Sequence, residues 1–328
     1  MRAIQISQTG GPEVLTEVEL PTPEPGAGEI RVQAEVIGVG RPDVLVRKGI
    51  YKWMPPLPAI PGSEMVGIVD ALGPGAFPSL KGRRVLVSAR ELAVRGGCYA
   101  DYICVPETAV FVFPEVIDPV DAASLPNLQF VNAVWACQAG RPVRAVLIPG
   151  VSGGVGSTLA QLARMHGAQV LGTTSPHKAA FALELGVDAL LTGDTDNWPA
   201  QVMELTHGVG VDLAVDQLGG DVLIACLRSL APMGQVVSIN VMTGMPSQDV
   251  FKEMRALLSR SPGLRTFSMH TLDQDPTVRR ALMQEAIDQM AQGRVKAPPA
   301  QVLNLSQIQE AHALLDAGAS RGKLVIKL

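Results

Sequence analysis

The pattern of hydrophobic and polar positions changes character about a third of the way along the chain. In the first part, short runs of alternating or β-branched residues lie between Pro- and Gly-rich segments such as Pro21–Gly28 and Pro55–Gly62. Short strands separated by such turns are typical of an antiparallel barrel or roll. The runs expected to form strands are Met1–Ser7, Glu29–Val36, Met65–Leu72, Arg84–Ser88 and Tyr99–Val105.

From about Ala122 onward, strand-like and helix-like patterns alternate. The expected strands are Ala145–Ile148, Gln169–Thr173, Ala189–Leu191, Leu213–Asp216 and Gln235–Ile239, with helical patterns at Ser157–His166, His177–Leu185 and Asp221–Leu230. This alternation predicts a parallel, doubly wound sheet. The regular pattern ends near Leu264, so we expect Gln235–Ile239 to lie at an edge of that sheet.

The C-terminal part returns to the first domain in this interpretation. Helical patterns at about Thr277–Gln292 and Ser306–Ala317 are followed by a closing strand, Gly322–Leu328. A closing strand needs a partner sheet, and the N-terminal β domain is the expected host. We therefore predict an α/β chain with two domains, the first made of residues 1–122 and 268–328 and the second of residues 123–267.

One segment of the second domain has the form of a dinucleotide-binding turn. An apolar run from Val146 passes into the glycine-rich stretch Gly150–Gly156, and a helical pattern opens at Ser157. Glycines permit a tight turn and allow a pyrophosphate to approach the backbone N–H groups at the start of the helix. The turn residues expected to contact a dinucleotide are Ser152, Gly153, Gly154, Val155 and Gly156.

The end of the next strand distinguishes NADP from NAD. An acidic residue about 20 positions after the glycines would bind the adenosine ribose hydroxyls of NAD. The segment Leu171–Lys178 contains no carboxylate, so nothing there repels a 2′-phosphate. Side chains that can hydrogen-bond or pair with that phosphate are Thr173, Thr174, Ser175 and Lys178. The predicted cofactor is therefore NADPH.

Composition and charge narrow the range of partners. The formal net charge is −4 and there is no run of Lys or Arg, so nucleic acid and anionic membranes are not expected partners. Since the chain has no uninterrupted apolar stretch of about 18 residues, we expect no membrane span, and we expect the N-terminal residues to form a strand and not a signal peptide. The four scattered cysteines favour a reduced, cytoplasmic protein. The five histidines show no ligand spacing and are expected at the surface or in helix caps.

Further motifs follow one another in order along nearly the whole chain. They include Gly10–Leu15, Asp43–Tyr51, Pro61–Gly67, Gly82–Val85, Gly97–Tyr102, Gly153–Ser157 and Val215–Gly219. Together they resemble the medium-chain dehydrogenase/reductase superfamily, and within it the zinc-free, zeta-crystallin-like quinone oxidoreductases. The resemblance implies a GroES-like barrel or roll as catalytic domain, a Rossmann domain that binds NADPH, and a homodimer, with a tetramer as the alternative.

The same resemblance bears on metal binding and on the reaction. The zinc-dependent relatives carry Cys and His where this chain has Gly40 and Ser63, and Glu64 alone remains. Since a catalytic zinc needs about three protein ligands, we expect no metal. Without a Lewis acid, the expected small-molecule substrate is already electrophilic, namely a quinone or another α,β-unsaturated carbonyl.

Candidate catalytic residues come from the segment that lines the active site in the family. Tyr51 is the leading candidate to hydrogen-bond the developing oxyanion, and an aromatic packing role is the alternative. Arg41 is expected to face a polar substrate or to have a structural role paired with Asp43 or exposed to solvent. Asn132 and Asn240 are expected beside the nicotinamide.

Two other functions stay open at this point. An enoyl-thioester reductase shares this fold and also needs no zinc, and Arg41, Arg47 and Lys48 are the clustered basic residues that could serve its longer substrate. A non-enzymatic, cofactor-binding protein has precedent among zeta-crystallin-like chains.

Overall fold

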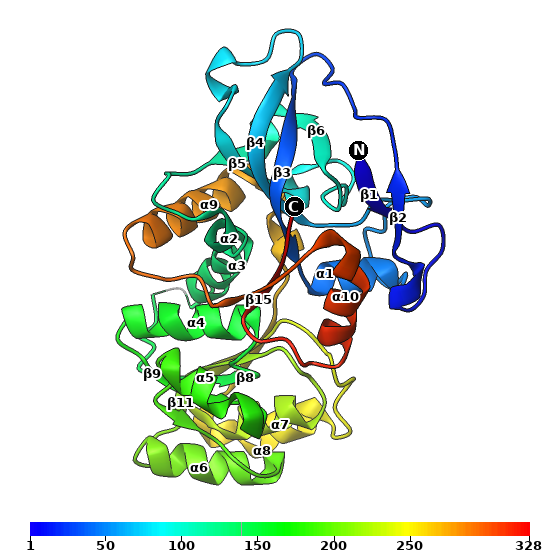
Figure 1. Cartoon of the computed structure of the whole chain (residues 1–328). Coiled ribbons are helices and arrows are strands. Elements are labelled where there is room, and N and C mark those ends of the chain that lie inside the picture. The colour runs from blue at the N-terminus through cyan, green and yellow to red at the C-terminus, as the bar shows by residue number, and fades with distance from the viewer. Residues whose placement is uncertain (139) are drawn as a thin grey trace. The chain divides into compact units, whose positions relative to one another are not determined.

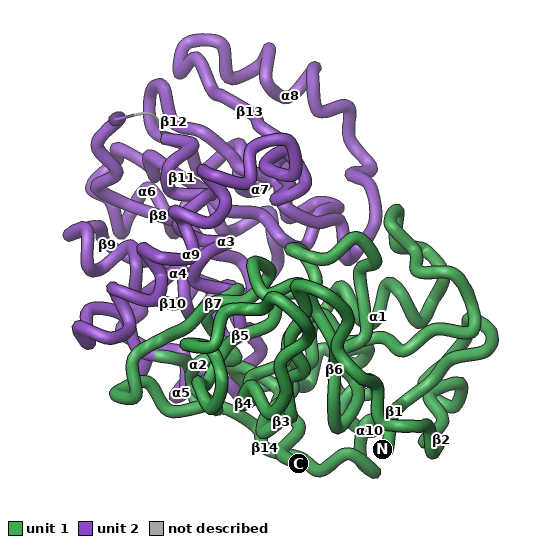
Figure 2. Tube along the Cα trace, turned by 90° about the horizontal axis from the view of Figure 1, so that it is seen from above, with its two compact units in different colours: residues 1–126, 297–328 green, residues 127–296 purple. Residues whose placement is uncertain are grey.

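The computed structural model describes residues 1–138 and 140–328, and it divides into two compact units. Unit 1 comprises Met1–Pro126 and Ala297–Leu328, and unit 2 comprises Asn127–Lys296, as the green and purple traces of Figure 2 show. The second boundary lies beyond the expected one at 267/268. Each unit has its own sheet and its own buried core.

The main sheet of unit 1 is almost entirely antiparallel. Its strand order is β14-β15-β3-β4-β5-β7, and β6 also pairs with β3. Only β14 and β15 pair in parallel, among the described strands of this sheet. The strands are β3 (Glu29–Val39), β4 (Glu64–Leu72), β5 (Arg84–Ser88), β6 (Tyr102–Pro106), β7 (Val110–Val112), β14 (Ala300–Leu303) and β15 (Lys323–Lys327). A separate antiparallel pair joins β1 (Arg2–Gln5) to β2 (Thr16–Glu19).

The closing strand pairs with the N-terminal sheet, as the sequence predicts. Leu324 of β15 lies opposite Val39 of β3, and the register continues to Lys327 opposite Val36. The apolar residues of β15 are buried, which supplies the hydrophobic reason for its return to this sheet. The helices of unit 1 are α1 (Arg41–Arg47), α2 (Pro119–Ala122) and α10 (Ile308–Asp316).

Unit 2 holds a six-stranded parallel sheet of order β10-β9-β8-β11-β12-β13. The chain starts in the middle at β8, extends the sheet to β10, and then returns to β11 and continues to β13. This is the doubly wound order with its switch point between β8 and β11, which confirms the predicted fold class. The strands are β8 (Ala145–Pro149), β9 (Gln169–Thr173), β10 (Ala189–Leu190), β11 (Val211–Asp216), β12 (Leu230–Ser238) and β13 (Gly263–Thr266).

The sixth strand corrects the prediction about the edge of this sheet. Gln235 of β12 pairs in parallel with Gly263 of β13, so Gln235–Ile239 is not the edge and that prediction is wrong. The segment Gly263–Thr266 has one apolar residue in four and is half-buried at first and exposed at its end. A strand so short and so little buried has almost no hydrophobic pattern, which is why the sequence did not reveal it.

Helices cover both faces of the parallel sheet. In Figure 1, α4 lies on one side of the strands of this unit and α7 on the other. The helices are α3 (Leu125–Ala136), α4 (Gly154–Met165), α5 (Ala179–Glu184), α6 (Trp198–Leu205), α7 (Asp221–Arg228), α8 (Val250–Ala256) and α9 (Pro276–Ala291).

The helix α9 explains where the second boundary falls. Gln129 of α3 donates from Nε2 to the carbonyl oxygen of Arg279 at 2.7 Å, and Asn132 of α3 donates from Nδ2 to Gln289 Oε1 at 3.1 Å. Both pairs are buried. Because α9 packs on α3, it belongs to unit 2, and only the chain from Ala297 onward returns to unit 1.

Candidate functional site

The glycine-rich turn after β8 is fastened to the end of β9. Gly150 has a φ of +69°, a conformation that L side chains rarely adopt, so glycine is required there. Its N–H donates to Thr173 Oγ1 at 3.2 Å, and the N–H of Val151 donates to the Thr173 carbonyl at 3.0 Å. The turn then closes with a bond from Gly153 N to Gly150 O at 3.1 Å. The conformation of the turn is therefore set by the neighbouring strand.

Helix α4 begins at Gly154, three residues before the expected start at Ser157. Gly153 is its N-cap, and the first intrahelical bond runs from Ser157 N to Gly153 O at 2.8 Å. The N–H groups of Gly154, Val155 and Gly156 precede that bond and point out of the helix start, where the helix dipole favours an anion. Four of the predicted turn residues thus lie at the helix N-terminus.

The glycines of this turn have different physical roles. A Cβ added at Gly156 would lie 2.7 Å from the Gly150 carbonyl oxygen and 2.8 Å from Val151 Cα, so only glycine lets the helix pack on the turn. A Cβ at Gly153 would meet Gly150 O at 3.5 Å, an ordinary contact. The packing of the protein therefore explains Gly156 but not Gly153, and a ligand that approaches the backbone closely would explain Gly153.

Hydroxyl groups gather where β9 ends beside this turn. Ser152 Oγ and Thr174 Oγ1 lie 2.7 Å apart, and Ser175 Oγ lies 3.5 Å from His177 Nε2. Lys178 is only 5% exposed, so it is not a solvated residue on an open helix turn. Ser175 is the N-cap of the short 3-10 helix Pro176–Lys178, but its side chain makes no capping bond.

Gln217 is a residue at this site that sequence reasoning missed. It follows β11 directly, at the switch point of the sheet, and its Nε2 donates to Pro149 O at 2.8 Å and to Gly150 O at 3.1 Å. The only clue in the sequence was that Gln217 comes directly after a predicted strand, within the motif Val215–Gly219. Nothing in the residue pattern alone indicated that its side chain reaches the neighbouring turn.

The two asparagines expected beside the nicotinamide have different surroundings. Asn132 is 4% exposed and its Nδ2 donates to Gln289, so its side chain joins α3 to α9. Asn240 follows β12 and is half-buried, with Oδ1 accepting from Val241 N at 2.9 Å. Both stay predicted cofactor contacts, and Asn132 also has a packing role between the two helices.

In unit 1, Asp43 is a buried carboxylate at the start of α1. Its Oδ2 accepts from Gly40 N at 2.8 Å and its Oδ1 accepts from Ser63 Oγ at 2.5 Å. Burial raises the pKa of Asp43 to about 6, against the lowering effect of the Ser63 hydroxyl and the Gly40 N–H. The Asp43 carboxylate therefore fixes the start of the helix, and no hydrogen bond to Arg41 is found in the described part of the chain.

The other two candidate catalytic residues also lie in unit 1. Arg41 Nη1 lies 3.5 Å from the Leu315 carbonyl of α10, and its buried Nε has no hydrogen-bond partner among the described residues. Tyr51 is half-buried against the core of the unit, with its ring centroid 5.8 Å from that of Trp53. The aromatic contact supports a packing role for Tyr51, and its role as a hydrogen-bond donor to substrate stays a prediction.

One histidine departs from the prediction for this residue type. His312 is fully buried, and its Nε2 lies 3.0 Å from the Tyr99 hydroxyl, so the expectation of a surface or cap position is wrong for it. Burial, and then the nearby Arg47 guanidinium, lower the pKa of His312 to about 3. Arg47 is itself buried and paired with Asp316 at 2.6 Å. This buried polar group stabilises the contact of α1 with α10.

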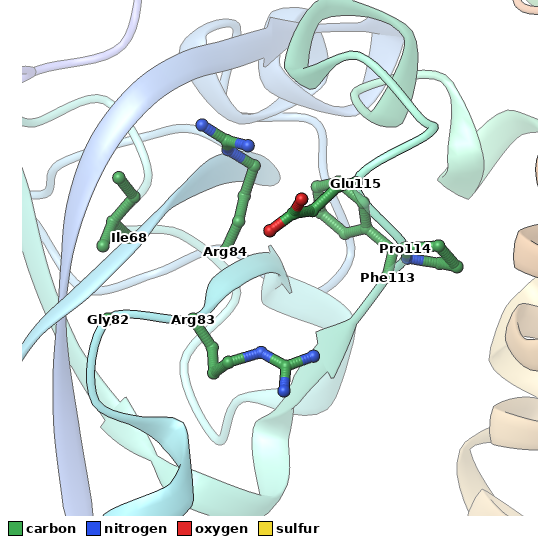
Figure 3. Close-up of a pocket in the computed structure, with 7 residues that line it drawn as sticks. All are labelled: Ile68, Gly82, Arg83, Arg84, Phe113, Pro114 and Glu115. Carbon is green, nitrogen blue, oxygen red and sulfur yellow. The ribbon is translucent and has the colours of Figure 1, made fainter.

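Unit 1 also carries a surface depression of about 250 Å³ that the sequence did not predict. Figure 3 shows the Glu115 carboxylate directed toward Arg84, while the Arg83 guanidinium points another way. Arg84 is already paired with Glu35 at 2.7 Å. The lining residues are Ile68, Gly82, Arg83, Arg84, Phe113, Pro114 and Glu115. None of the predicted site residues lines this depression.

Two further properties bear on the sequence predictions. All four cysteines are free, and burial raises the pKa of the Cys98 and Cys226 thiols well above the usual range. In the ranges 1–138 and 140–328, no helix has both the length and the apolar character needed to cross a membrane.

Comparison with known proteins places this geometry in context. The family model described as "Alcohol dehydrogenase GroES-like domain" matches residues 26–115, and the one described as "Zinc-binding dehydrogenase" matches residues 185–326. A quinone oxidoreductase of Rattus norvegicus is 30% identical over 243 residues, which cover 73% of this chain and 73% of that protein.

Solved structures agree with the sequence matches. A quinone oxidoreductase of Pseudomonas syringae pv. Tomato aligns with a TM-score of 0.87 and 27% identity, covering 100% of this chain and 99% of the other. A mycobacterial protein solved in complex with NADPH aligns with a TM-score of 0.85 and 29% identity over 100% of both chains. The predicted GroES-like and Rossmann domains are confirmed.

One of the two matching families is described as zinc-binding, but the residues of this chain at the expected ligand positions are engaged otherwise. Glu64 Oε2 is bonded at 2.5 Å to the ammonium group of Lys323, which is 3% exposed. The Ser63 hydroxyl donates to Asp43, and Gly40 has no side chain. Across the described residues, no three His, Cys, Asp or Glu side chains come together to hold a metal. The residues at these positions do not fit a catalytic zinc.

Proposed function

The chain belongs to the medium-chain dehydrogenase/reductase superfamily, in its quinone oxidoreductase-like family, and we propose that it reduces quinones or other α,β-unsaturated carbonyls with NADPH. Membership makes the chain an oxidoreductase. The observation that carries the proposal is the turn at Gly150–Gly156, which leads into the N-terminus of α4 beside a strand end rich in hydroxyl groups.

The residues of unit 2 account for binding of the cofactor. The N–H groups at Gly154, Val155 and Gly156 suit a pyrophosphate, because they are unused within the helix and lie at the positive end of its dipole. At the end of β9, Thr174 and Lys178 suit a 2′-phosphate, since no carboxylate of the segment 171–178 opposes it. The mycobacterial relative solved with NADPH supports the same choice of cofactor. When bound, NADPH supplies the hydride.

The residues of unit 1 bear on the choice of acceptor. The Glu64 carboxylate forms an ion pair with the Lys323 ammonium group, and Gly40 and Ser63 offer no Cys or His ligand for zinc. We therefore propose a reaction that needs no metal. An acceptor with a conjugated carbonyl suits such a site because its carbon is already electrophilic. We propose that the chain positions this acceptor and that Tyr51 or water hydrogen-bonds its oxygen.

We also propose that the protein is a homodimer, with a tetramer as the alternative. β13 is the outer strand of the parallel sheet, and exposed sheet edges are usually paired or covered. The exposed large apolar side chains that follow β12 in the chain include Phe251 on α8, which is 73% exposed, and Leu258, which is 55% exposed. We propose that a second copy pairs with β13 and also covers these side chains, which would remove them from water.

The test of the proposed reaction is a substrate panel with folded, NADPH-bound protein. NADPH oxidation is followed with benzoquinone and naphthoquinone derivatives, a free enone and crotonyl-CoA. We expect turnover with quinones and the free enone. A marked preference for crotonyl-CoA would favour the enoyl-thioester reductase. Cofactor binding without turnover of any acceptor would favour the non-enzymatic alternative.

A further inference from the structure

A side-chain amide ties the two halves of the parallel sheet together at their switch point. Gln217, the first residue after β11, uses Nε2 to donate to the carbonyl oxygens of Pro149 and Gly150 at the end of β8, at 2.8 and 3.1 Å. Both neighbours are acceptors, so the amide nitrogen and not the amide oxygen must face them. The orientation of this side chain is therefore fixed by chemistry.

The amide and the turn are also fitted to each other in shape. A Cβ at Gly150 would lie 3.0 Å from Gln217 Nε2 and 3.7 Å from its Cδ, so the Gln217 side chain occupies the space that a side chain at Gly150 would need. The base of Gln217 is held by Asp216, whose Oδ1 accepts from the N–H groups of Leu218 and Gly219, both at 2.9 Å. The amide is thus held at the end of a rigid strand.

The contact continues into the helix start that would bind the pyrophosphate. Gly150 O accepts from Gln217 Nε2 and also from Gly153 N, at 3.1 Å in each case. Gly153 in turn accepts the first intrahelical bond of α4 from Ser157. One carbonyl oxygen therefore links β11 to the N-cap of α4.

We propose that Gln217 is a positioning residue for the dinucleotide, which fixes the Gly150 carbonyl and through it the N–H groups at the start of α4. This inference rests on the proposed use of NADPH. In this proposal the two strands that flank β8, namely β9 and β11, contribute differently to binding of the cofactor. On the β9 side, Thr173 accepts from the Gly150 N–H and Thr174 serves the adenosine half, whereas Gln217 on the β11 side holds the Gly150 carbonyl and serves the pyrophosphate.

The test compares two ligands on Gln217→Met, which keeps the length of the side chain and removes both donors. NADPH spans the turn, whereas adenosine 2′-monophosphate reaches only the end of β9. We expect the NADPH Kd to rise about tenfold and the Kd of adenosine 2′-monophosphate to stay within about twofold of the wild type. The matched control is Gln169→Met, because Gln169 Nε2 likewise donates to a backbone carbonyl, that of Leu205, but lies at the first residue of β9, at the other end of the strand from the turn. This control should change neither Kd.

A second variant and a second measurement guard against a folding defect. Gln217→Glu keeps the shape of the side chain but sets a carboxylate against two carbonyl oxygens, so it should weaken NADPH more than Gln217→Met does. Hydrogen exchange at residues 150–156 should be faster in both variants without cofactor. Unchanged NADPH binding in folded Gln217→Met, or equal weakening of both ligands, would overturn the inference. A wild type that binds adenosine 2′-monophosphate but not NADPH would overturn the proposed function as well.

Discussion

At the scale of single residues, burial decides what a polar side chain can do. Asp43, Lys323 and His312 are each at most 3% exposed, and each has a hydrogen-bonding partner from another part of unit 1. Leaving such a group without its partner costs more free energy than the contact itself contributes. Substitutions at these positions should therefore change stability as well as any activity, and the pH dependence of stability can separate the two.

Asp43→Asn should change how the free energy of unfolding depends on pH. The folded pKa of about 6 lies above the unfolded value of 3.8, so the folded state retains the proton and gains stability at low pH. That contribution is complete below about pH 4 and is lost as pH rises through 6, a change of about 3 kcal/mol. Urea unfolding of both proteins at several pH values should give profiles that diverge across this window. Parallel profiles would contradict the raised pKa.

Thr174→Asp should reverse the preference between the two cofactors. A carboxylate at the end of β9 would repel the 2′-phosphate and could bind the ribose hydroxyls of NADH. We expect the NADPH Kd to rise by about tenfold or more, with NADH binding unchanged or tighter. Thr277→Asp is the control, since Thr277 is exposed and lies in the first turn of α9 instead. Equal effects of the two substitutions would show that Thr174 does not face the phosphate.

At the scale of elements, two glycines at the start of α4 have different roles, one in the packing of the helix and the other in the binding of the cofactor. Gly156→Ala places a Cβ 2.7 Å from Gly150 O, so it should destabilise the fold by about 1–3 kcal/mol. Gly153→Ala meets only an ordinary contact at 3.5 Å, so it should leave stability nearly unchanged and still weaken NADPH binding. Thermal unfolding and cofactor titration of the two variants measure the difference. Normal NADPH binding by Gly153→Ala would contradict the assigned approach of the pyrophosphate.

The elements also show how far the sequence could predict the fold. The strands β8, β9 and β11 are buried on both faces and read clearly as apolar runs, so their order and the turn after β8 could be predicted. β13 could not, because it is short and partly exposed. The contact of Gln217 with Gly150 could not be predicted either, because it joins residues 67 positions apart through the topology of the sheet. The packing role of Asn132 likewise depends on α9, which is distant in the sequence.

At the scale of the whole molecule, the proposed homodimer can be tested with a substitution on the surface of unit 2. Phe251→Glu places a charge on an exposed apolar residue of α8, which the proposed dimer covers, so it should weaken a dimer without unfolding the subunit. Val116→Glu is a matched control, because Val116 is also 73% exposed but belongs to unit 1. Light scattering at micromolar concentration should report a lower mass only for Phe251→Glu. A wild type that is already monomeric would contradict the proposed homodimer.

The account as a whole depends on metal-independent reduction of a conjugated carbonyl by NADPH. The most direct measurement is the steady-state rate of NADPH oxidation by a small quinone, using protein treated with a strong chelator and verified to be free of zinc. We predict that the chelated protein retains the full rate and that NADH supports a much lower kcat/KM. Loss of the rate on chelation with recovery on adding zinc, or no quinone reduction by folded, NADPH-bound protein, would contradict the account.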